Sequence, residues 1–263
     1  FKRDAFVLLR EIEDDGALNF DDAIQEELVH PFRSFREQVQ QRVSQPIRDS
    51  LQIEERDLRI ASRFWREREG KAAQKEFVFY PGDGILRESP VLFVELLSEG
   101  IQAGFRIGPY AIHAREKLFD HVEDLNEVLK YILADHFDDP DLLFGSPDGY
   151  LNEGTLVRQE NVDWRSWLEN PGNQLHTVVY KKWDSQAIPV IEEERLARQI
   201  VETLEKLYPL VLLATDEKPV TSIGRYLEGS VEEETQNPEP TFSLSDIEEE
   251  TGIGTDILQQ WTE

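Results

Sequence analysis

Three short runs decide the fold: Glu76-Phe-Val-Phe-Tyr80, Val91-Leu-Phe-Val-Glu-Leu-Leu97 and Ile101-Gln-Ala-Gly-Phe-Arg-Ile107. Each run is brief and rich in aromatic and branched residues, which predicts β-strands. The cluster Pro81-Gly-Asp-Gly84 predicts a turn after the first run, and Ser98-Glu-Gly100 predicts a hairpin between the other two. We therefore expect the middle of the chain to form a mostly antiparallel sheet.

Apolar residues at helical spacing flank this sheet on both sides. This spacing predicts helices at 6–12, 20–30, 32–43, 54–69, 111–120, 122–133 and 191–207, with Pro209 interrupting the last. Later strands are expected at 155–159 and 175–182. The predicted fold class is α+β: a helical N-terminal third, a central mostly antiparallel sheet flanked by helices, an acidic linker and a short C-terminal helical pair.

The composition excludes several classes of protein. The 263 residues include 39% hydrophobic residues, enough to bury a core, and no cysteine. Without cysteine there are no disulfides, thiolate zinc sites, iron–sulfur ligands or cysteine nucleophiles. No apolar run approaches the length of a membrane span, about 20 residues. The chain opens Phe1-Lys-Arg-Asp4 without Met or a secretory pattern, so we expect a piece of a longer cytoplasmic protein.

The charge is strongly negative, with 54 acidic against 28 basic residues and a net charge of −26. A large net charge keeps a protein soluble when salt screens repulsion, so the composition favours a halophilic cytoplasm. An ordinary acidic protein and a binder of basic partners are the alternatives. On the halophilic interpretation, the informative places are those where basic residues predominate.

The acidic residues are most concentrated near the C-terminus. Residues 216–263 hold 13 acidic and 2 basic residues, which predicts an acidic linker over 216–240 after a domain spanning 1–215. Ser245-Asp-Ile-Glu248 is a capping box that opens a helical pair within 241–263. The pair resembles a helix-turn-helix but has six acids and no Lys or Arg, so we expect packing at a domain junction rather than DNA reading.

One segment reverses the sign of the charge. Residues 56–75 contain seven basic and three acidic residues, a local balance of +4. On the expected helix, spacings of three and four place Arg56, Arg59, Arg63 and Arg66 on one face. Arginine forks grip phosphates bidentately, so the row predicts contacts with a DNA backbone, joined by Arg68 and Lys71. The alternative is that these arginines pair with surrounding acids.

A second basic and aromatic group lies at 176–183. Alternation along a strand would place His176, Tyr180 and Lys182 on one face and Lys181 and Trp183 on the other. Lys181 and Lys182 are secondary DNA contacts on this hypothesis, and the aromatic rings could stack on bases. The alternative is an edge strand whose lysines prevent aggregation. The candidates for a base pocket are Trp65, Tyr80, Arg106, Tyr110 and Trp183, and the alternative is that each is a core or rim residue.

Metal, nucleophile and nucleotide motifs are weak. The five histidines lack metalloprotease spacing, and no Walker motif is present, so no nucleotide is expected on a P-loop. The run 210–218 resembles the strand followed by Asp-x-Lys of metal-dependent nucleases. Asp216 and Lys218 are the Asp and the Lys of this pattern. It lacks a convincing upstream acid partner. No catalytic residue and no metal ligand are therefore predicted.

The C-terminal segment resembles a known family. Phe242-Ser-Leu-Ser-Asp-Ile-Glu-Glu-Glu-Thr251 and Ile257-Leu-Gln-Gln-Trp261 are similar to the segment that precedes the ATPase core of McrB-like AAA+ restriction proteins. Phe77–Tyr80, Val91–Glu95 and Gly104–Tyr110 look like uncharacterised domains fused to such ATPases.

The resemblance implies a non-catalytic specificity domain that binds double-stranded DNA and in some members senses modified bases. It also implies a partner nuclease, and a downstream AAA+ module that binds ATP or GTP with magnesium and assembles homo-oligomers. No cofactor is expected within residues 1–263. Two alternatives remain: a protein-interaction or oligomerisation module of the same type of protein, and a metal-dependent nuclease centred on Asp216.

Overall fold

Six strands form one antiparallel sheet in the order β1-β2-β3-β4-β8-β5. The computed structural model describes residues 3–15, 21–63, 70–145, 150–152, 155–157, 163–169 and 177–234. The strands of the sheet are β1 (Leu51–Arg63), β2 (Gly70–Pro81), β3 (Pro90–Leu97), β4 (Gly100–Ile107), β5 (Leu143–Gly145) and β8 (Thr177–Asp184). A separate pair joins β6 (Tyr150–Asn152) to β7 (Thr155–Val157). The central antiparallel sheet and the hairpin of β3 and β4 are confirmed.

Helices precede the sheet, interrupt it and follow it. They are α1 (Arg3–Asp15), α2 (Asp21–Ala23), the π-helical η2 (Ile24–Val29), α3 (His30–Arg42), α4 (Gln45–Ser50), α5 (Ile112–Ile132), α6 (Ala134–Phe137), α7 (Trp164–Glu169), α8 (Glu193–Thr215) and α9 (Pro219–Glu234). Two short 3-10 turns, η3 (Leu86–Glu88) and η4 (Ile188–Val190), complete the described elements. The α+β class is therefore confirmed, and α5 replaces the two helices expected over 111–133. No helix in the described ranges is long and apolar enough to cross a membrane.

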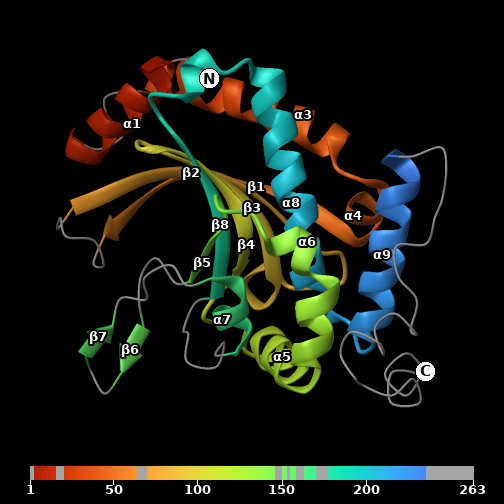
Figure 1. Cartoon of the computed structure of the whole chain (residues 1–263). Helices are drawn as coiled ribbons and strands as arrows, with labels where there is room; N and C mark the ends of the chain where they lie inside the picture. The colour runs from red at the N-terminus through yellow and green to blue at the C-terminus, as the bar shows by residue number, and fades with distance from the viewer. Residues whose placement is uncertain are drawn as a thin grey trace.

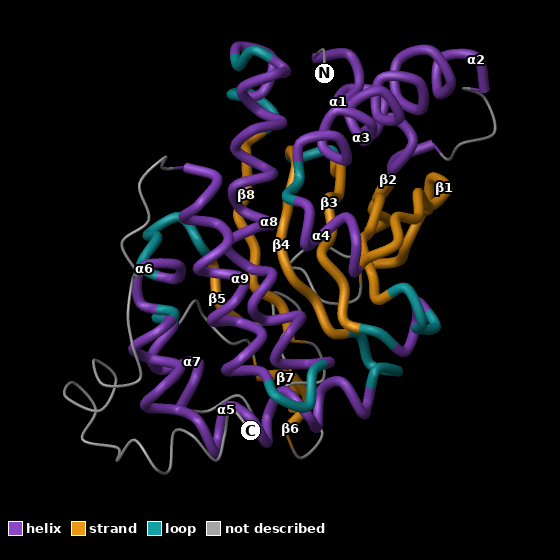
Figure 2. Tube along the Cα trace, turned by 90° about the vertical axis from the view of Figure 1, so that its right-hand side faces the viewer, coloured by secondary structure: helices purple, strands orange, loops and turns teal. Residues whose placement is uncertain are grey.

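The two faces of the sheet bury different side chains. Successive residues of a strand point to opposite faces, so Phe77 and Phe79 pack with the helices while Val78 faces away. The helix-covered face holds the main core, which takes side chains from α1, α3, α5, α7, α8 and α9 (Figures 1 and 2). The other face, here called the open face, holds a small cluster of Val78, Val91, Phe93 and Val178. No residue of a described α-helix joins this small cluster.

The helix expected over 54–69 is wrong as far as Arg63. Residues 51–63 form β1, which pairs with β2 from Leu51 opposite Pro81 to Arg63 opposite Gly70. The helical spacing of the arginines was misleading because strand pairing supplies backbone hydrogen bonds along the whole segment. Residues 64–69 lie outside the described part.

Helix α8 continues through Pro209, where an interruption was expected. Proline lacks an N–H, so it leaves the carbonyl of the residue four positions earlier without its helical donor. That residue is Glu205, and its carbonyl oxygen accepts a hydrogen bond from the Tyr226 hydroxyl at 2.9 Å. Tyr226 comes from α9, so the second helix repairs the defect in the first.

Helix α9 occupies most of the range 216–240, where a linker was expected. Its residues Val220, Ile223, Tyr226 and Leu227 are buried in the main core. They recur at helical spacing inside an acidic segment, and their burial against α8 outweighs the polar composition. Residues 235–263, including the expected C-terminal helical pair, lie outside the described part.

The repair of α8 is open to a mutational test. Tyr226→Phe should lower the free energy of unfolding by about 1–2 kcal/mol, because the partly buried Glu205 carbonyl loses this donor. Pro209→Ala restores the missing N–H, so Tyr226→Phe should cost much less in that background. Urea unfolding of the four proteins measures both effects. An equal cost of Tyr226→Phe in both backgrounds would contradict this role of Tyr226.

Candidate nucleic-acid interface

Strands β1 and β2 extend beyond the rest of the sheet as a two-stranded ribbon. Pairing of β2 with β3 ends at Gln74 opposite Leu97, whereas pairing of β1 with β2 continues from Arg59 opposite Gln74 to Arg63 opposite Gly70. We call residues 59–63 and 70–74 the ribbon, which projects from the sheet in Figure 1. Helix α1 holds its base, where the Ala73 N–H donates to Glu13 Oε1 at 3.1 Å. The sheet therefore presents a narrow, anchored projection.

The hairpin that contains the ribbon is the basic segment of the chain. Residues 59–74 contain the basic residues Arg59, Arg63, Arg66, Arg68 and Lys71 and the acidic residues Glu67 and Glu69, a balance of +3 in a chain of −26. Arg59 is exposed, and Arg63 and Lys71 lie in the paired strands. Arg66, Arg68 and the predicted pocket residue Trp65 lie outside the described residues. The ribbon thus concentrates charge opposite in sign to that of the whole protein.

A β-bulge places two of the predicted arginines on the same face of the sheet. Arg56 pairs with Glu76 and Arg59 pairs with Gln74, so two residues of β1 lie opposite one residue of β2. Without the bulge, residues three apart on a strand would point to opposite faces. The predicted helical row is therefore replaced by a strand with an extra residue, and both arginines lie on the open face.

On the open face two arginines share one buried carboxylate. Arg56 Nη1 lies 2.6 Å from Glu76 Oε1, and Arg106 Nη2 lies 2.8 Å from Glu76 Oε2. Glu76 is only 2% exposed. Burial acts to raise the pKa of Glu76, but the charges and hydrogen bonds of Arg106 and Arg56 outweigh it, so the pKa lies below its usual 4.5. Glu76 on β2 therefore binds Arg56 on β1, a candidate phosphate contact, and Arg106 on β4, a candidate residue of the base pocket.

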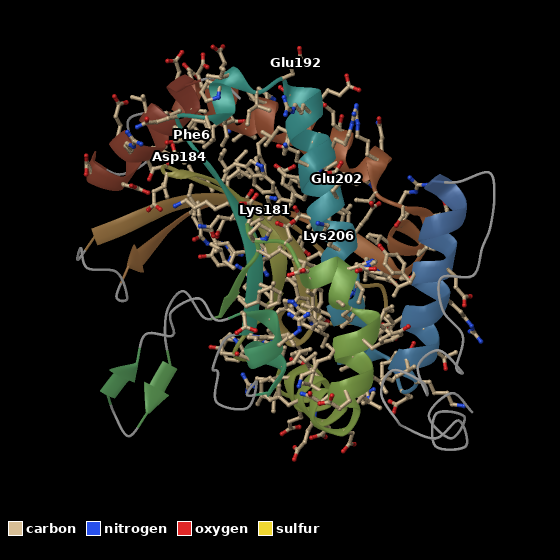
Figure 3. All side chains as sticks on the ribbon, viewed as in Figure 1. Phe6, Lys181, Asp184, Glu192, Glu202 and Lys206 are labelled. Carbon is tan, nitrogen blue, oxygen red and sulfur yellow. The ribbon has the colours of Figure 1, made fainter. Side chains whose placement is uncertain are left out.

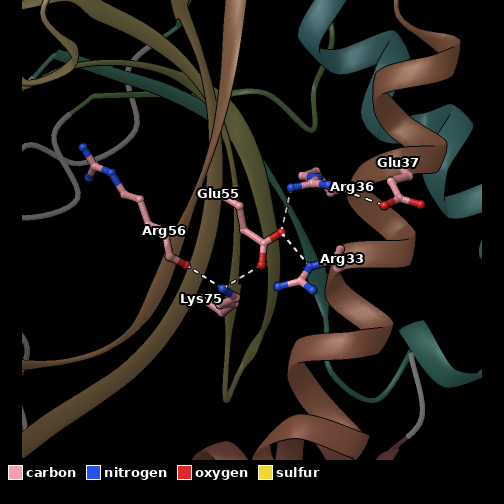
Figure 4. Close-up of polar contacts among 6 residues, drawn as sticks. All are labelled: Arg33, Arg36, Glu37, Glu55, Arg56 and Lys75. Carbon is pink, nitrogen blue, oxygen red and sulfur yellow. Dashed lines mark hydrogen bonds and ion pairs between the residues drawn. The ribbon is translucent and has the colours of Figure 1, made fainter.

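The neighbouring residue, Lys75, is anchored on the helix-covered face. Its Nζ lies 2.8 Å from Glu55 Oε1 and donates to the Arg56 carbonyl oxygen at 2.7 Å (Figure 4). Glu55 Oε2 also accepts from Arg36 Nη1 of α3 at 2.9 Å, and Arg33 Nε lies 3.8 Å away. Lys75 is 3% exposed. It is therefore a structural member of the basic segment that ties the hairpin to α3.

Strand β8 separates the predicted residues Lys181, Lys182 and Trp183. Lys182 lies on the open face, opposite Gln102, and its Nζ is 3.1 Å from Glu99 Oε2. Lys181 pairs with Asp141 at 2.9 Å and Asp139 at 3.7 Å on the helix-covered face, near Lys206 of α8 (Figure 3). The alternation is as predicted. Of these three residues, the structure brings only Lys182 onto the face shared by Arg56 and Arg106.

The aromatic candidates for a base pocket are dispersed. Trp183 is buried against α8 and donates from Nε1 to Gln199 Oε1 at 3.2 Å. Tyr110 is 71% exposed in the turn after β4. Tyr80 lies on the open face, where its hydroxyl donates to Gln52 Oε1 at 3.1 Å. Tyr80 and Arg106 are thus the members of the predicted pocket that lie on the same face.

Asp216 has a structural contact that accounts for its position. The expected strand before it is the C-terminal part of α8, and its carboxylate accepts hydrogen bonds from the Ser222 hydroxyl and, at 3.0 Å, from the Lys218 N–H. Burial acts to raise the pKa of Asp216, but these hydrogen bonds and nearby charge lower it overall. Within the described ranges no three His, Asp or Glu side chains are grouped to hold a metal ion.

Sequence reasoning missed three polar residues of the open face: Glu76, Glu95 and Gln102. All three are buried, and they lie directly opposite one another on β2, β3 and β4. Glu95 and Gln102 are visible in the sequence as polar residues inside apolar runs, whereas Glu76 directly follows the polar residues Gln74 and Lys75. Only the register of the strands shows that these residues form one row.

No protein-family model matches the chain, and no curated protein is significantly similar to it. The resemblance to McrB-like proteins therefore remains an expectation, and residues 241–263, on which it mainly rests, lie outside the described part.

The shared carboxylate predicts a pH-dependent stability. Glu76→Gln should destabilise the fold by about 3 kcal/mol at neutral pH, because two partly buried arginines lose their counter-charge. Since the folded pKa of Glu76 is lowered, its contribution is present above about pH 4.5 and is lost as the pH falls through the folded pKa. Urea unfolding between pH 7 and pH 3 should show the gap between wild type and variant closing.

The control for this experiment is Glu54→Gln, which removes an exposed carboxylate from the same strand pair. It should change stability little at any pH. A gap between wild type and Glu76→Gln that stayed constant over the whole pH range would contradict the assigned role of Glu76.

Proposed function

We propose that the chain is a non-catalytic DNA-binding domain whose ribbon enters a groove of the duplex. The observation that carries this proposal is the projection of the basic hairpin beyond the sheet of an otherwise acidic protein. The major groove of B-DNA is wide enough for a two-stranded β-ribbon. Arginine and lysine at the ribbon supply contacts to phosphates or base edges.

The open face extends this interface at the base of the ribbon. Arg56 and Arg59 share that face, and Glu76 fixes the guanidinium group of Arg56. A guanidinium group that is already oriented loses less conformational entropy when it binds a phosphate. The acidic remainder of the surface repels DNA, which favours a single docking orientation.

The biological setting follows from the resemblance stated above. We place the domain in a cytoplasmic NTP-dependent restriction or defence system of the McrB-like type. There it would select DNA for a partner nuclease, while an AAA+ module using ATP or GTP with magnesium would drive assembly. The acidic composition fits a halophilic host, in which binding must tolerate strong salt.

Charge reversal of the ribbon tests the proposed DNA contact. Replacing Arg59, Arg63 and Lys71 by Glu should abolish detectable binding to duplex DNA, because both phosphate attraction and groove fit are lost. The neutral triple substitution by Gln should reduce the slope of log affinity against log salt by about 2.7, roughly 0.9 for each lost phosphate contact. Fluorescence anisotropy over a salt series measures both quantities.

A matched control reverses three exposed arginines on the helices, Arg195, Arg198 and Arg225. It changes the net charge equally but leaves the ribbon intact, so most of the duplex affinity should remain. Equal losses in the two reversed variants would show that net charge alone governs binding, and unchanged binding after ribbon reversal would overturn the proposal.

A protein-interaction module is the second candidate, supported by exposed apolar side chains at one end of the sheet. Ile85, Tyr110 and Ile112 are 61%, 71% and 49% exposed. Ile85 precedes η3 and β3, Tyr110 lies in the turn after β4, and Ile112 is the first residue of α5. Exposed apolar side chains favour contact with another protein surface.

Light scattering after gel filtration tests this second candidate. If these side chains form an interface between copies of the chain, the protein should be larger than a monomer, and the triple change to Ser should return it to monomer. A monomeric wild type at high concentration would remove the self-association version of this function.

A further inference from the structure

Three cations meet one carboxylate where α3 faces β1. Glu55 of β1 lies 2.8 Å from Lys75 Nζ and accepts from Arg36 Nη1 at 2.9 Å, and Arg33 Nε lies 3.8 Å from the same carboxylate (Figure 4). The exposed Glu37 side chain lies 3.5 Å from Arg36 Nη2. With Glu37 included, three positive charges face two negative ones. This cluster is therefore a second place where basic residues predominate in a protein whose net charge is −26.

Burial divides the cluster into a fixed part and an exposed part. Lys75 is 3% exposed, and the side chains of Glu55 and Arg36 are 9% and 22% exposed. Lys75 and Arg36 compensate the charge of Glu55 at hydrogen-bonding distance. The Arg33 side chain is 53% exposed, and its separation of 3.8 Å from Glu55 is too long for a hydrogen bond. The Glu55 carboxylate therefore does not require Arg33.

Arg33 and Arg36 retain unused donor capacity. Within the described ranges Arg33 makes no polar contact besides the one with Glu55, and Nε of Arg36 is buried without a hydrogen-bond partner. A guanidinium group offers five N–H donors in a planar fork that matches a phosphate group. The two arginines are three residues apart on α3, so they lie on one side of the helix. The pair thus has more donors than the neighbouring carboxylates use.

The packing of α3 fixes the position of this pair relative to the ribbon. Phe32, next to Arg33, packs on Phe77 of β2 with ring centres 5.4 Å apart, and both rings are fully buried. Glu55 precedes Arg59 by four residues on β1, which is at most about 13 Å along a strand. The major groove of B-DNA is about 12 Å wide. A ribbon that enters the groove would therefore bring the DNA backbone at the rim of the groove toward α3.

We propose that Arg33 binds a backbone phosphate of duplex DNA at the rim of the groove that the ribbon enters. This inference rests on the DNA-binding function proposed above and adds a contact from a helix. Arg33 supplies the guanidinium fork, and Arg36 adds a second positive charge beside it. Glu55 and Lys75 are positioning residues, which hold Arg36 in place and leave Arg33 available for the phosphate. Phosphate contacts from two elements fix the orientation of the duplex.

Arg33→Gln tests this contact in the full chain. We expect it to weaken binding to a short duplex about tenfold and to lower the slope of log affinity against log salt by about 0.9, the value for one phosphate contact. Arg33→Lys keeps the charge but loses the fork, so it should retain the slope and lose only part of the affinity. Arg195→Gln, which removes an exposed arginine from α8, is the matched control and should change neither quantity. Fluorescence anisotropy over a salt series measures all four proteins.

Neutralising single phosphates identifies the position that Arg33 contacts. In a set of duplexes, each with one methylphosphonate in place of a phosphate, one backbone charge is missing at a known position. At the contacted position, this change should weaken binding of the wild type but add nothing to the loss in Arg33→Gln. Additive losses at every position would contradict the contact.

The stability of the variant separates binding from a structural role of Arg33. Urea unfolding of Arg33→Gln should match that of the wild type, because an exposed ion pair contributes little. Unchanged affinity in the folded Arg33→Gln variant, or an equal loss in Arg195→Gln, would overturn the inference but leave the function of the ribbon intact. Absence of duplex binding by the wild type would instead overturn the DNA-binding function itself, and this inference with it.

Discussion

Two adjacent residues of opposite charge, Lys75 and Glu76, hold the β1–β2 hairpin in place from both sides of the sheet. Alternation sends Lys75 to Glu55 and α3, and Glu76 to Arg56 and Arg106. Buried charges are costly unless paired, so each contact strongly disfavours other registers. A one-residue slip would exchange the two faces and leave both charges without partners. The position of the ribbon, the residues of the open face and the contacts that hold α3 against the sheet all depend on this register.

The helix layer gives the sheet its asymmetry. Most of the apolar side chains gather on the helix-covered face, and α9 adds to this layer by repairing the proline defect in α8. With the helices on one side, the other face is left with a small apolar cluster and buried polar groups. Because its two faces differ in this way, a single sheet can hold the main core on one face and polar groups on the other.

Local patterns identified the elements whose own residues determine them. The hairpin of β3 and β4 consists of two apolar strands joined by a turn at Gly100, where φ is +147°. The strand pattern and the turn residues therefore predicted the same hairpin. β1 was misassigned because its arginines follow helical spacing and its pairing with β2 is not visible in the sequence. The acidic composition of α9 concealed Val220, Ile223 and Leu227, although their spacing was helical.

The candidate site shows the same limit. Arg106, Tyr80 and Lys182 were selected by residue type, but their common face follows from register. Glu76, Glu95 and Gln102 were overlooked because a polar residue in a strand has no evident partner until the strands are aligned. The bulge in β1 is equally a tertiary feature, and it decides on which face Arg59 lies.

The placement of positive charge on a projection from a negative body makes the molecule an electric dipole. In dilute salt, where screening extends over about 10–30 Å, a nearby polyanion would exert a torque that turns the ribbon forward before contact. At about 1 M salt the screening length falls to about 3 Å, and the torque vanishes until the surfaces almost touch. In a halophilic cytoplasm the protein would therefore reach its partners by diffusion without electrostatic steering. It would distinguish one partner from another only after the surfaces touch.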